Sequence, residues 1–407
     1  MTGRGAFAAS ASEQGVDVER LELDGEVASG EITLSAGLPD RRLAARGRVE
    51  IELAPALEWF EPDLAALLRP SGRLVLSGSV SQANAFGTGN RVTAQINTGD
   101  VNTVYALSFL NPYFTLDGIS LGYDLYKRDV NTDSIDVGDY ESSTLGAGVR
   151  FGFPVNERDF ISLGLVYEQT SITTSPTSPQ QYIDYVNTFG SDNDVVRVDA
   201  SWARDTRNSF LFPTKGTLQR VSSEVGTPLG SLQYYKVSFQ HQQFFPLSEH
   251  FTLMINGEVG LGGGLDGKPL PFFENFYAGG SSSVRGFETG TLGPKDIQGD
   301  ALGGEQRVTG NLELFFPLPG IKDDQSLRMS AFIDAGGAFG PGGSPISIYG
   351  PQSTFSDFSF DDLGVSAGVA VLWVSPLGPL KFSLAQPLVS QPGDKEEVFQ
   401  FTLGNSF

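Results

Sequence analysis

The chain has 407 residues, a formal net charge of -21, two histidines and no cysteine. The acidic balance disfavours nucleic acid as a partner, and the lack of cysteine excludes disulfides, thiolate nucleophiles and cysteine-ligated metal sites. No apolar run approaches the ~18 residues that a transmembrane helix needs. Apolar residues instead alternate with polar ones in short segments between turn signals, a pattern typical of an all-β protein and of a transmembrane β-barrel in particular.

Residues 1–71 are predicted to form an N-terminal segment of their own. Residues 1–14 are small and polar, so we expect them to be disordered. They lack the apolar core of a signal peptide, which indicates a fragment, a processed form or an artificial start. Alternating runs at 16–23, 31–37 and 47–53 predict short antiparallel strands, and residues 56–69 predict a helical turn.

Residues 72–407 are predicted to form an antiparallel transmembrane β-barrel of about 16 strands. Most of the recognisable strands have about 8–14 residues, against the ~9–11 that a tilted membrane-spanning strand needs. Short turns alternate with long polar loops at 173–194, 263–306 and 340–362, as in outer-membrane barrels. The fifteen recognisable strands are residues 73–81, 91–98, 103–111, 120–130, 143–154, 159–172, 195–206, 217–226, 232–246, 251–262, 307–317, 327–339, 364–375, 379–388 and 397–407.

Alternation within the later strands assigns two acidic residues to the barrel lumen. In 307–317, the apolar Leu312, Leu314 and Phe316 alternate with polar residues that include Glu313. In 327–334, a similar apolar set alternates with polar residues that include Asp334. Because a charge on the lipid-facing side costs roughly 2–4 kcal/mol at mid-bilayer for a basic residue and less for an acid, both carboxylates are predicted to face inward.

The loop that contains residues 271–308 carries one conspicuous cation, Arg285, among glycines, serines and five aromatic residues. Loops longer than about 12–15 residues are usually functional or disordered. The aromatic residues give this loop enough apolar surface to pack, so we expect it to be ordered and to fold back against the rest of the chain.

The last strand ends on an aromatic residue. Phe399, Phe401, Leu403 and Phe407 share one face of it, and this ending resembles the C-terminal signal of bacterial outer-membrane proteins.

Several motifs together resemble the barrel of the BamA family of outer-membrane β-barrel assembly factors. The frame FYAGGSSSVRGF…LGP is specific, whereas VRGF alone is a weak signal. The matching segments cover about four fifths of the chain and are NAFGTGN (84–90), NPYFTLDGISLGY (111–123), FGFPVNE (151–157), SWARDTRNSFLFPTKGT (201–217), PFFENFYAGGSSSVRGFETGTLGP (271–294), MSAFIDAGG (329–337), WVSPLGPLKFSLAQPL (373–388) and GDKEEVFQFTLGNSF (393–407).

The resemblance implies roles for particular residues. The loop that carries Val284, Arg285, Gly286 and Phe287 is expected to insert into the lumen, where Arg285 would pair with Glu313 and Asp334. The family barrel has sixteen strands, and its first and last strands pair weakly at a lateral seam. The resemblance therefore assigns to the seam strand the residues Phe399, Phe401, Leu403, Gly404 and Phe407.

Two features depart from the family pattern. The segment that matches the family's second strand is 73–81, and no upstream segment matches its first strand, for which residues 47–53 are the substitute candidate. The family also carries periplasmic POTRA domains of about 75 residues each before the barrel, and residues 1–71 do not read as one of them.

Three enzyme-like motifs have simpler structural interpretations. Residues 364–368 match G-x-S-x-G but lie within a predicted strand, with both histidines before them. Gly262, Gly264 and Gly267 match G-x-G-x-x-G, but no helix follows them. His241 and His250 alone supply too few ligands for a metal. We expect no enzyme activity, no cofactor and no metal site.

The first functional hypothesis is therefore a non-enzymatic assembly factor of the bacterial outer membrane. It would fold and insert β-barrel proteins through a weak seam between its first and last strands, because an unpaired edge can accept another strand. The expected partners are unfolded outer-membrane protein clients, outer-membrane lipid and lipopolysaccharide, and accessory assembly lipoproteins.

Two alternatives remain open. One is a related barrel transporter that secretes a passenger polypeptide, and the other is a truncated or fused barrel fragment without full activity. A passive porin is disfavoured, because the central loop should plug the lumen.

Overall fold

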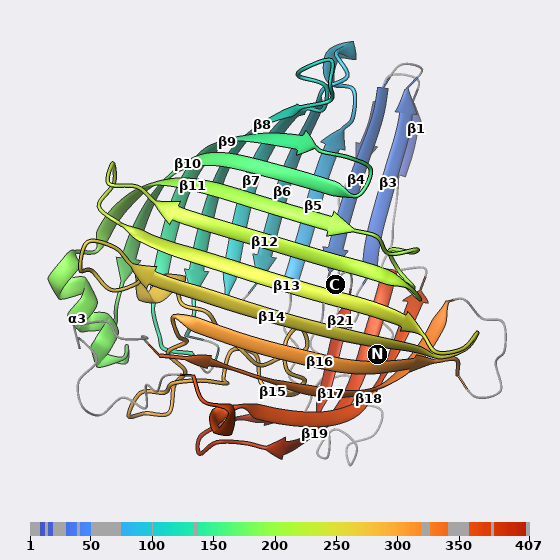
Figure 1. Ribbon diagram of the computed structural model, residues 1–407. Coiled ribbons are helices and arrows are strands. Elements are labelled where there is room, and N and C mark those ends of the chain that lie inside the picture. Colours follow the sequence, from blue (N-terminus) through green and yellow to red (C-terminus); the bar gives the residue numbers. More distant parts are fainter. Residues whose placement is uncertain are drawn as a thin grey trace, which may run out of the picture.

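The computed structural model describes residues 9–12, 15–18, 30–38, 41–49, 75–99, 101–133, 135, 137–318, 326–340, 358–375 and 378–403. Within these residues, seventeen strands follow one another around a closed barrel in the order in which they occur along the chain (Figure 1). The barrel strands are β3 Gly30–Leu38, β4 Arg41–Val49, β5 Val75–Gln82, β6 Arg91–Gly99, β7 Asn102–Asn111, β8 Ser120–Asn131, β9 Glu141–Pro154, β10 Asp159–Thr173, β11 Asp192–Asp205, β12 Gly216–Gly226, β13 Tyr234–Pro246, β14 Thr252–Gly264, β16 Gln306–Phe316, β17 Leu327–Phe339, β18 Gly364–Ser375, β19 Gly378–Val389 and β21 Phe399–Leu403.

The predicted transmembrane β-barrel is confirmed. Each of the fifteen strands recognised from residue 73 onward is present, with ends that differ by a few residues, most of all in the last strand. Four short strands complete the list: β1 Ala9–Ser12 and β2 Gly15–Val18 form a separate hairpin, and β15 Gly286–Phe287 pairs with β20 Glu396–Glu397.

The N-terminal predictions need correction. Residues 9–12 were expected to be disordered but pair as β1 with β2, and the predicted strand 16–23 is found as Gly15–Val18. The predicted strand 47–53 overlaps β4 Arg41–Val49, which begins earlier because it pairs with β3 from Leu38↔Arg41 onward. Residues 50–53 of the prediction lie outside the described residues. The predicted helical turn at 56–69 lies outside the described residues.

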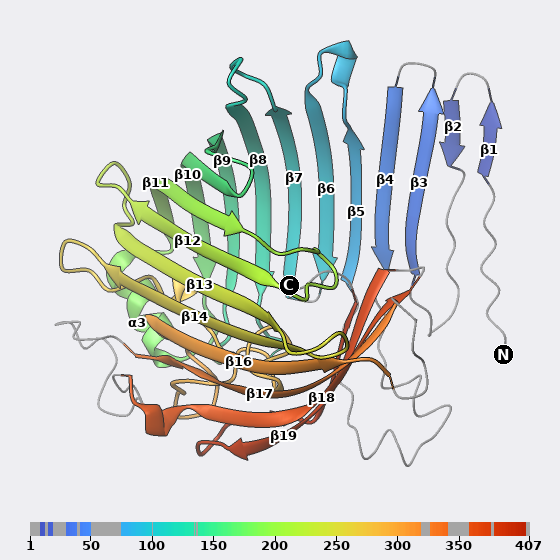
Figure 2. The same cartoon turned by 45° about the vertical axis from the view of Figure 1, so that its right-hand side comes forward.

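Two strands of the N-terminal segment belong to the barrel sheet. In the strand order, β3 lies between β4 and β21. Figure 2 shows the β3–β4 hairpin beside β5, with its lower end meeting the ends of the C-terminal strands in red. The other neighbouring pairs around the barrel are all antiparallel. Because the strand count is odd, β3 and β21 run in the same direction.

The two ends of the barrel carry connections of different length. Residues 132–140, 174–191 and 265–305 connect strands at one end, whereas residues 155–158 and 247–251 connect strands at the other. Since outer-membrane barrels have short periplasmic turns and longer extracellular loops, the long-loop end faces the cell exterior.

One α-helix lies in a long extracellular loop that was predicted to be irregular. This helix, α3 Gln180–Phe189, begins after Pro179 and places Tyr182, Tyr185, Val186 and Phe189 at helical spacing. Short 3-10 helices occur at Ala85–Gly87, Phe272–Glu274 and Phe360–Asp362. No helix among the described residues is long and apolar enough to cross a membrane.

The barrel wall separates an apolar exterior from a polar interior. Alternate residues such as Leu107, Leu125, Leu165 and Leu312 are exposed on the outer wall. The residues between them face the lumen, where buried side chains of the wall and of the loop at 265–305 form the core. The core of this protein is therefore built around the inserted loop.

Candidate functional site

The motif Val284–Phe287 lies at the centre of the lumen core. Val284 and Phe287 are fully buried and pack in one apolar cluster with Ala278, Leu292 and Ala338. Arg285 is 3% exposed, so its guanidinium is removed from water and needs partners within the protein.

Those partners are two buried carboxylates on neighbouring strands. Arg285 Nε donates to Asp334 Oδ2 at 2.6 Å and Nη2 donates to Asp334 Oδ1 at 2.8 Å, which is a bidentate pair. Arg285 Nη1 donates to Glu313 Oε1 at 3.2 Å. Asp334 lies on β17 and is fully buried, and Glu313 lies on β16 and is 3% exposed. The guanidinium plane therefore joins the loop to two adjacent strands at once.

Residues that were not selected from the sequence complete this polar cluster. Asn311 Nδ2 donates to Asp334 Oδ1 at 2.9 Å and to the carbonyl of Ser283 at 2.7 Å. Ser330 donates to Glu313, and Ser366 donates to the carbonyl of Arg285.

Two further side chains act on the same charges. The Phe332 ring centroid lies 3.4 Å from the Arg285 guanidinium carbon, and Lys381 on β19 adds a favourable charge interaction with Glu313. The period-two phase of their own strands places Asn311 with Glu313, and Ser330 and Phe332 with Asp334. Ser366 and Lys381 lie on β18 and β19, so only the register between strands brings them to this cluster.

Gly286 allows the loop to touch the wall. Its φ of +88° is one that side-chain-bearing residues rarely adopt. A Cβ at this position would lie 3.1 Å from the Ala385 Cβ and 3.2 Å from the Ser366 Cβ. A larger residue at 286 would therefore push the loop away from β18 and β19.

The motif is also bonded to the segment that leads into the last strand. Gly286 and Phe287 form β15, which pairs with Glu396 and Glu397 of β20. The side chain of Gln400, which is itself in β21, donates to the carbonyl of Phe287 at 2.8 Å. The backbone N–H of Glu288 donates to the carbonyl of Lys395 at 2.9 Å. The loop thus contacts the closing part of the barrel as well as β16 and β17.

The extracellular side of the loop is covered by α3. Tyr182 stacks on Phe272 with ring centroids 4.0 Å apart, and both side chains are buried. Tyr140 and Tyr185 meet the same Phe272 ring edge-on. Burial raises the pKa of Tyr140 and of Tyr185 above the ordinary tyrosine value, so both hydroxyls stay protonated at physiological pH.

A cationic cavity of about 380 Å³ lies on the periplasmic side of the loop tip. Its wall includes Ser281–Ser283 of the loop and, from a short turn, Arg207, Phe210 and Leu211. Arg328 donates to the carbonyl of Pro213, which ties that turn to β17. The loop tip and this turn therefore face the same cavity on the lumen side of the wall.

The enzyme-like motifs occupy strand and turn positions. Gly364–Gly368 begin β18, and Gly262 and Gly264 end β14. His241 faces Gln219 at 3.2 Å, and His250 lies in a turn. The residues that the structure describes contain no group of three or more acidic, histidine or cysteine side chains arranged to hold a metal ion.

Of the predicted seam residues, three are described. Phe399, Phe401 and Leu403 occupy alternate positions of β21, opposite Leu384, Phe382 and Leu380 of β19. Phe401 and Phe382 also contact through their rings, with centroids 4.9 Å apart. Gly404 and Phe407 lie outside the described residues.

Residues 84–407 match the model of the Omp85 superfamily domain. The chain is 41% identical over 371 residues to the outer membrane protein assembly factor BamA of Neisseria meningitidis serogroup B, an alignment that covers 85% of this chain and 46% of that protein. It is 25% identical over 342 residues to a SAM50-like protein of Schizosaccharomyces pombe, which covers 83% of this chain and 66% of that protein.

Among solved structures, BamA from Haemophilus ducreyi lacking POTRA domains 1–3 superposes with a TM-score of 0.77 at 26% identity and covers 92% of this chain and 74% of that one. The chain spans about half the length of the curated BamA relatives that it matches, 46% and 45%.

Proposed function

The chain belongs to the Omp85 superfamily, and from that membership we propose that it is an outer-membrane protein assembly factor that folds and inserts β-barrel clients. The protein is located in the bacterial outer membrane, as its BamA relatives and its barrel indicate. The observation that carries the proposal is the link between the loop motif and the closing strands, from Gly286–Phe287 to Glu396–Glu397 and Gln400.

The proposed mechanism depends on strand pairing and requires no covalent step. An edge strand presents unpaired backbone N–H and C=O groups that can template a client strand. β21 is the last strand of the barrel sheet in chain order, and β3 is the first. The weak seam is therefore proposed between β21 and β3, where the two ends of the sheet meet.

The inserted loop is proposed to hold the barrel wall while this seam opens. The Arg285 pairs with Asp334 and Glu313 fix the loop to β16 and β17, which stay in the sheet. The β15–β20 pairing and the Gln400 hydrogen bond hold the residues next to β21 from inside. The loop would therefore limit how far β21 moves and return it after a client has left.

We propose the partners that this activity needs, namely unfolded outer-membrane proteins, the surrounding lipid and lipopolysaccharide, and accessory assembly lipoproteins. Enzyme activity is not part of the proposal, because no step breaks a covalent bond. We also propose residues 72–407 as the family barrel, to which residues 1–71 contribute β3 and β4 as an additional hairpin.

A disulfide lock at the seam tests the assembly function. The chain has no cysteine, so any disulfide that forms within it must join the two cysteines introduced into β3 and β21. A cysteine in place of Phe401 is combined with single cysteines along Gly30–Leu38, and the pair that oxidises is reconstituted into vesicles. Folding of an unfolded barrel client should be accelerated by the reduced protein and not by the oxidised one.

Equal client folding by the locked and unlocked proteins would refute the seam mechanism. Client folding at the rate of empty vesicles, with either protein, would refute the assembly function itself. The second candidate, a transporter that secretes a passenger, predicts passenger release across the membrane without any acceleration of client folding.

A further inference from the structure

The cationic cavity on the periplasmic side of the loop tip concentrates positive charge in a chain whose net charge is -21. The cationic side chains that line it are Arg207, Arg220, Arg285, Arg307, Arg328 and Lys381. It has two acidic lining residues, and both already have cationic partners. Glu313 accepts a hydrogen bond from Arg285, and Glu258 contacts Arg307. The acids of the wall are therefore used within the wall itself.

Three cations of the cavity have no carboxylate beside them. Arg207 Nη2 lies 2.7 Å from Asp205 Oδ2, so this arginine is paired in its own turn. Arg220, Arg328 and Lys381 form no ion pair with any of the residues that the structure describes. Arg328 is half-buried, and a charge that is partly removed from water gains more from an anionic partner than a solvated one does. The cavity can thus accept negative charge from outside the chain.

Two of these cations lie on one row of lumen-facing side chains, with an apolar residue between them. Arg328 of β17 is opposite Leu372 of β18, and Leu372 is opposite Lys381 of β19. Two strand spacings, or roughly 10 Å, separate the backbones of the two cations, so both side chains can reach an anion that lies over Leu372. The Arg328 guanidinium carbon lies 4.4 Å from the centroid of the Phe315 ring, which adds a second apolar surface to this row.

Arg328 is held in place but keeps donors for a ligand. Its Nη1 donates to the carbonyl of Pro213 at 3.1 Å. A guanidinium has five N–H donors in a planar fork, a geometry that matches the oxygens of a phosphate or a carboxylate. The bond to Pro213 uses one of the five, so the fork can still bind two oxygens of an anion.

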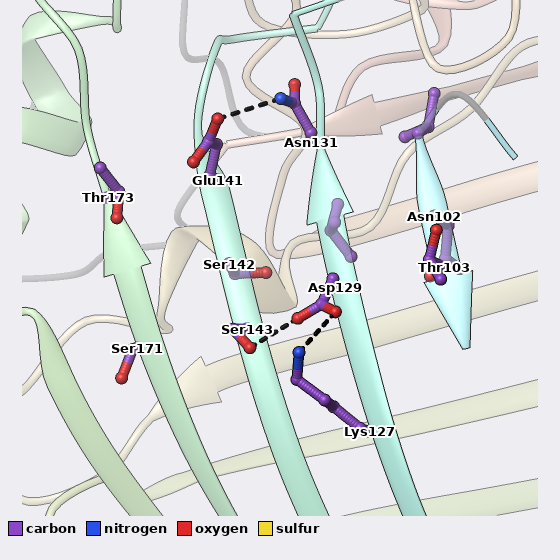
Figure 3. A pocket seen from close by; sticks show the side chains of 12 residues that line it. Asn102, Thr103, Lys127, Asp129, Asn131, Glu141, Ser142, Ser143, Ser171 and Thr173 are labelled. Atoms are coloured by element: carbon purple, nitrogen blue, oxygen red, sulfur yellow. Dashed lines mark hydrogen bonds and ion pairs between the residues drawn. The ribbon is translucent and has the colours of Figure 1, made fainter. Parts of the chain in front are cut away.

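A hollow on the outer wall of β7 to β10 shows the opposite arrangement (Figure 3). There Lys127 points to Asp129, with 2.8 Å between Nζ and Oδ2, and Ser143 donates to the same carboxylate at 2.6 Å. A lysine paired in this way has little attraction left for an anion. Arg328 and Lys381 have no such partner among the described residues, which distinguishes the cavity in the lumen from this hollow.

We propose that the cationic cavity binds a phosphate monoester with a compact apolar body, which enters from the periplasm. A phosphate monoester carries about -1.5 to -2 charges near neutral pH, so it balances the unpaired cations better than a single carboxylate does. Arg328 binds two phosphate oxygens, Lys381 a third, and the hydroxyls of Ser281–Ser283 donate to the ester. The apolar body packs on Leu372 and Phe315. The volume of about 380 Å³ lies within the roughly 300–1,000 Å³ of small-molecule sites.

The proposal is independent of the assembly function and is tested by binding alone. The purified full chain, in micelles of a detergent without phosphorus, is titrated with phenyl phosphate near neutral pH. Line broadening of the phosphorus NMR signal, corrected for empty micelles, gives the bound fraction. Lys381→Gln should weaken binding about tenfold, which corresponds to about 1.4 kcal/mol. Arg328→Gln should weaken it at least as much and is the second variant if Lys381→Gln does not fold. The matched control is Lys127→Gln, which removes a lysine of the outer wall and should bind as the wild type does.

Two further ligands, both titrated into the wild type, identify what is recognised. Inorganic phosphate lacks the apolar body and benzoate carries a single charge, so each should bind more weakly than phenyl phosphate. Benzoate binding as tight as that of phenyl phosphate would overturn the assignment to a phosphate, and inorganic phosphate binding as tight would overturn the role of Leu372 and Phe315. The absence of saturable binding to the wild type would overturn the site itself. Wild-type affinity of folded Lys381→Gln and Arg328→Gln, or an equal loss in Lys127→Gln, would do the same.

Discussion

Replacing Arg285 by alanine removes the cation that two buried carboxylates share. Asp334 is fully buried and Glu313 is 3% exposed, so neither can turn to water without opening the wall. Removing one partner of a buried ion pair typically costs about 3–5 kcal/mol, because the remaining charge is uncompensated. The lost contact with the Phe332 ring adds to this, and protonation of one carboxylate limits the total. We expect a loss of about 4 kcal/mol in the free energy of unfolding.

The measurement is equilibrium unfolding in urea of the protein inserted in vesicles. With a urea dependence of about 3 kcal/mol per molar, a loss of about 4 kcal/mol lowers the midpoint by roughly 1 M. The variant should also migrate as unfolded at a lower temperature in a heat-modifiability gel. Limited proteolysis at Ser281–Ser283 should become faster, because the loop has lost its main attachment to β17. Arg158→Ala, in an exposed short turn, is the matched control and should leave all three readouts unchanged.

A compensating variant separates charge imbalance from simple loss of contact. Arg285→Met combined with Asp334→Asn removes the guanidinium together with its bidentate partner, keeps similar volumes and leaves Glu313 with Lys381. Because replacing a whole buried ion pair is often close to neutral, this double variant should recover most of the loss. An Arg285→Ala protein with the wild-type midpoint and protease resistance would refute the reasoning, and so would a double variant less stable than the single one.

Three further predictions concern other parts of the site. Burial raises the pKa of Glu305, next to β16. The stabilisation that the protonated carboxyl gives is therefore fully present below the ordinary glutamate pKa and is lost as pH rises through the raised value. Glu305→Gln should remove this pH dependence from the unfolding midpoint. Tyr182→Ala should cost about 3–5 kcal/mol and expose the α3 loop to protease, whereas the exposed Thr188→Ala should not. With cysteine at Phe401, disulfides should form with positions of β3 and not with positions of β4, and the reverse result would show that the strand order at the seam is wrong.

The barrel and its polar cluster follow from a local property, the period-two alternation. Along 307–317 and 327–334 this alternation alone assigns Glu313 and Asp334 to one side of the wall, and both contact Arg285. The same alternation contains Asn311, Ser330 and Lys381, which were on the correct face but were not recognised as neighbours of the charge. Recognising them requires the register between strands, which depends on distant parts of the chain.

The missed elements have different physical causes. The helix α3 was assigned to a polar loop because the segment contains polar residues such as Asp184, Asn187 and Thr188. Its apolar residues Tyr182, Tyr185 and Phe189 nevertheless repeat at helical spacing. The contact between Phe287 and Gln400 joins residues that are far apart in sequence, and no local pattern encodes it. The start of β4 at Arg41 depends on its pairing with β3, which begins at Leu38↔Arg41 and extends the strand before the alternating residues 47–53.

Because the described barrel has an odd number of strands, losing one strand changes both its perimeter and the relative direction of the two strands that close it. Each strand occupies about 4.8 Å of the wall, so β3 widens the perimeter by that amount. If β3 leaves the sheet, sixteen strands remain from β4 to β21, and these two then run in opposite directions. A single-strand exchange at this position therefore converts a parallel closure into an antiparallel one and narrows the barrel in the same step. Entry of a two-stranded hairpin would preserve the direction of closure, and entry of one strand would reverse it.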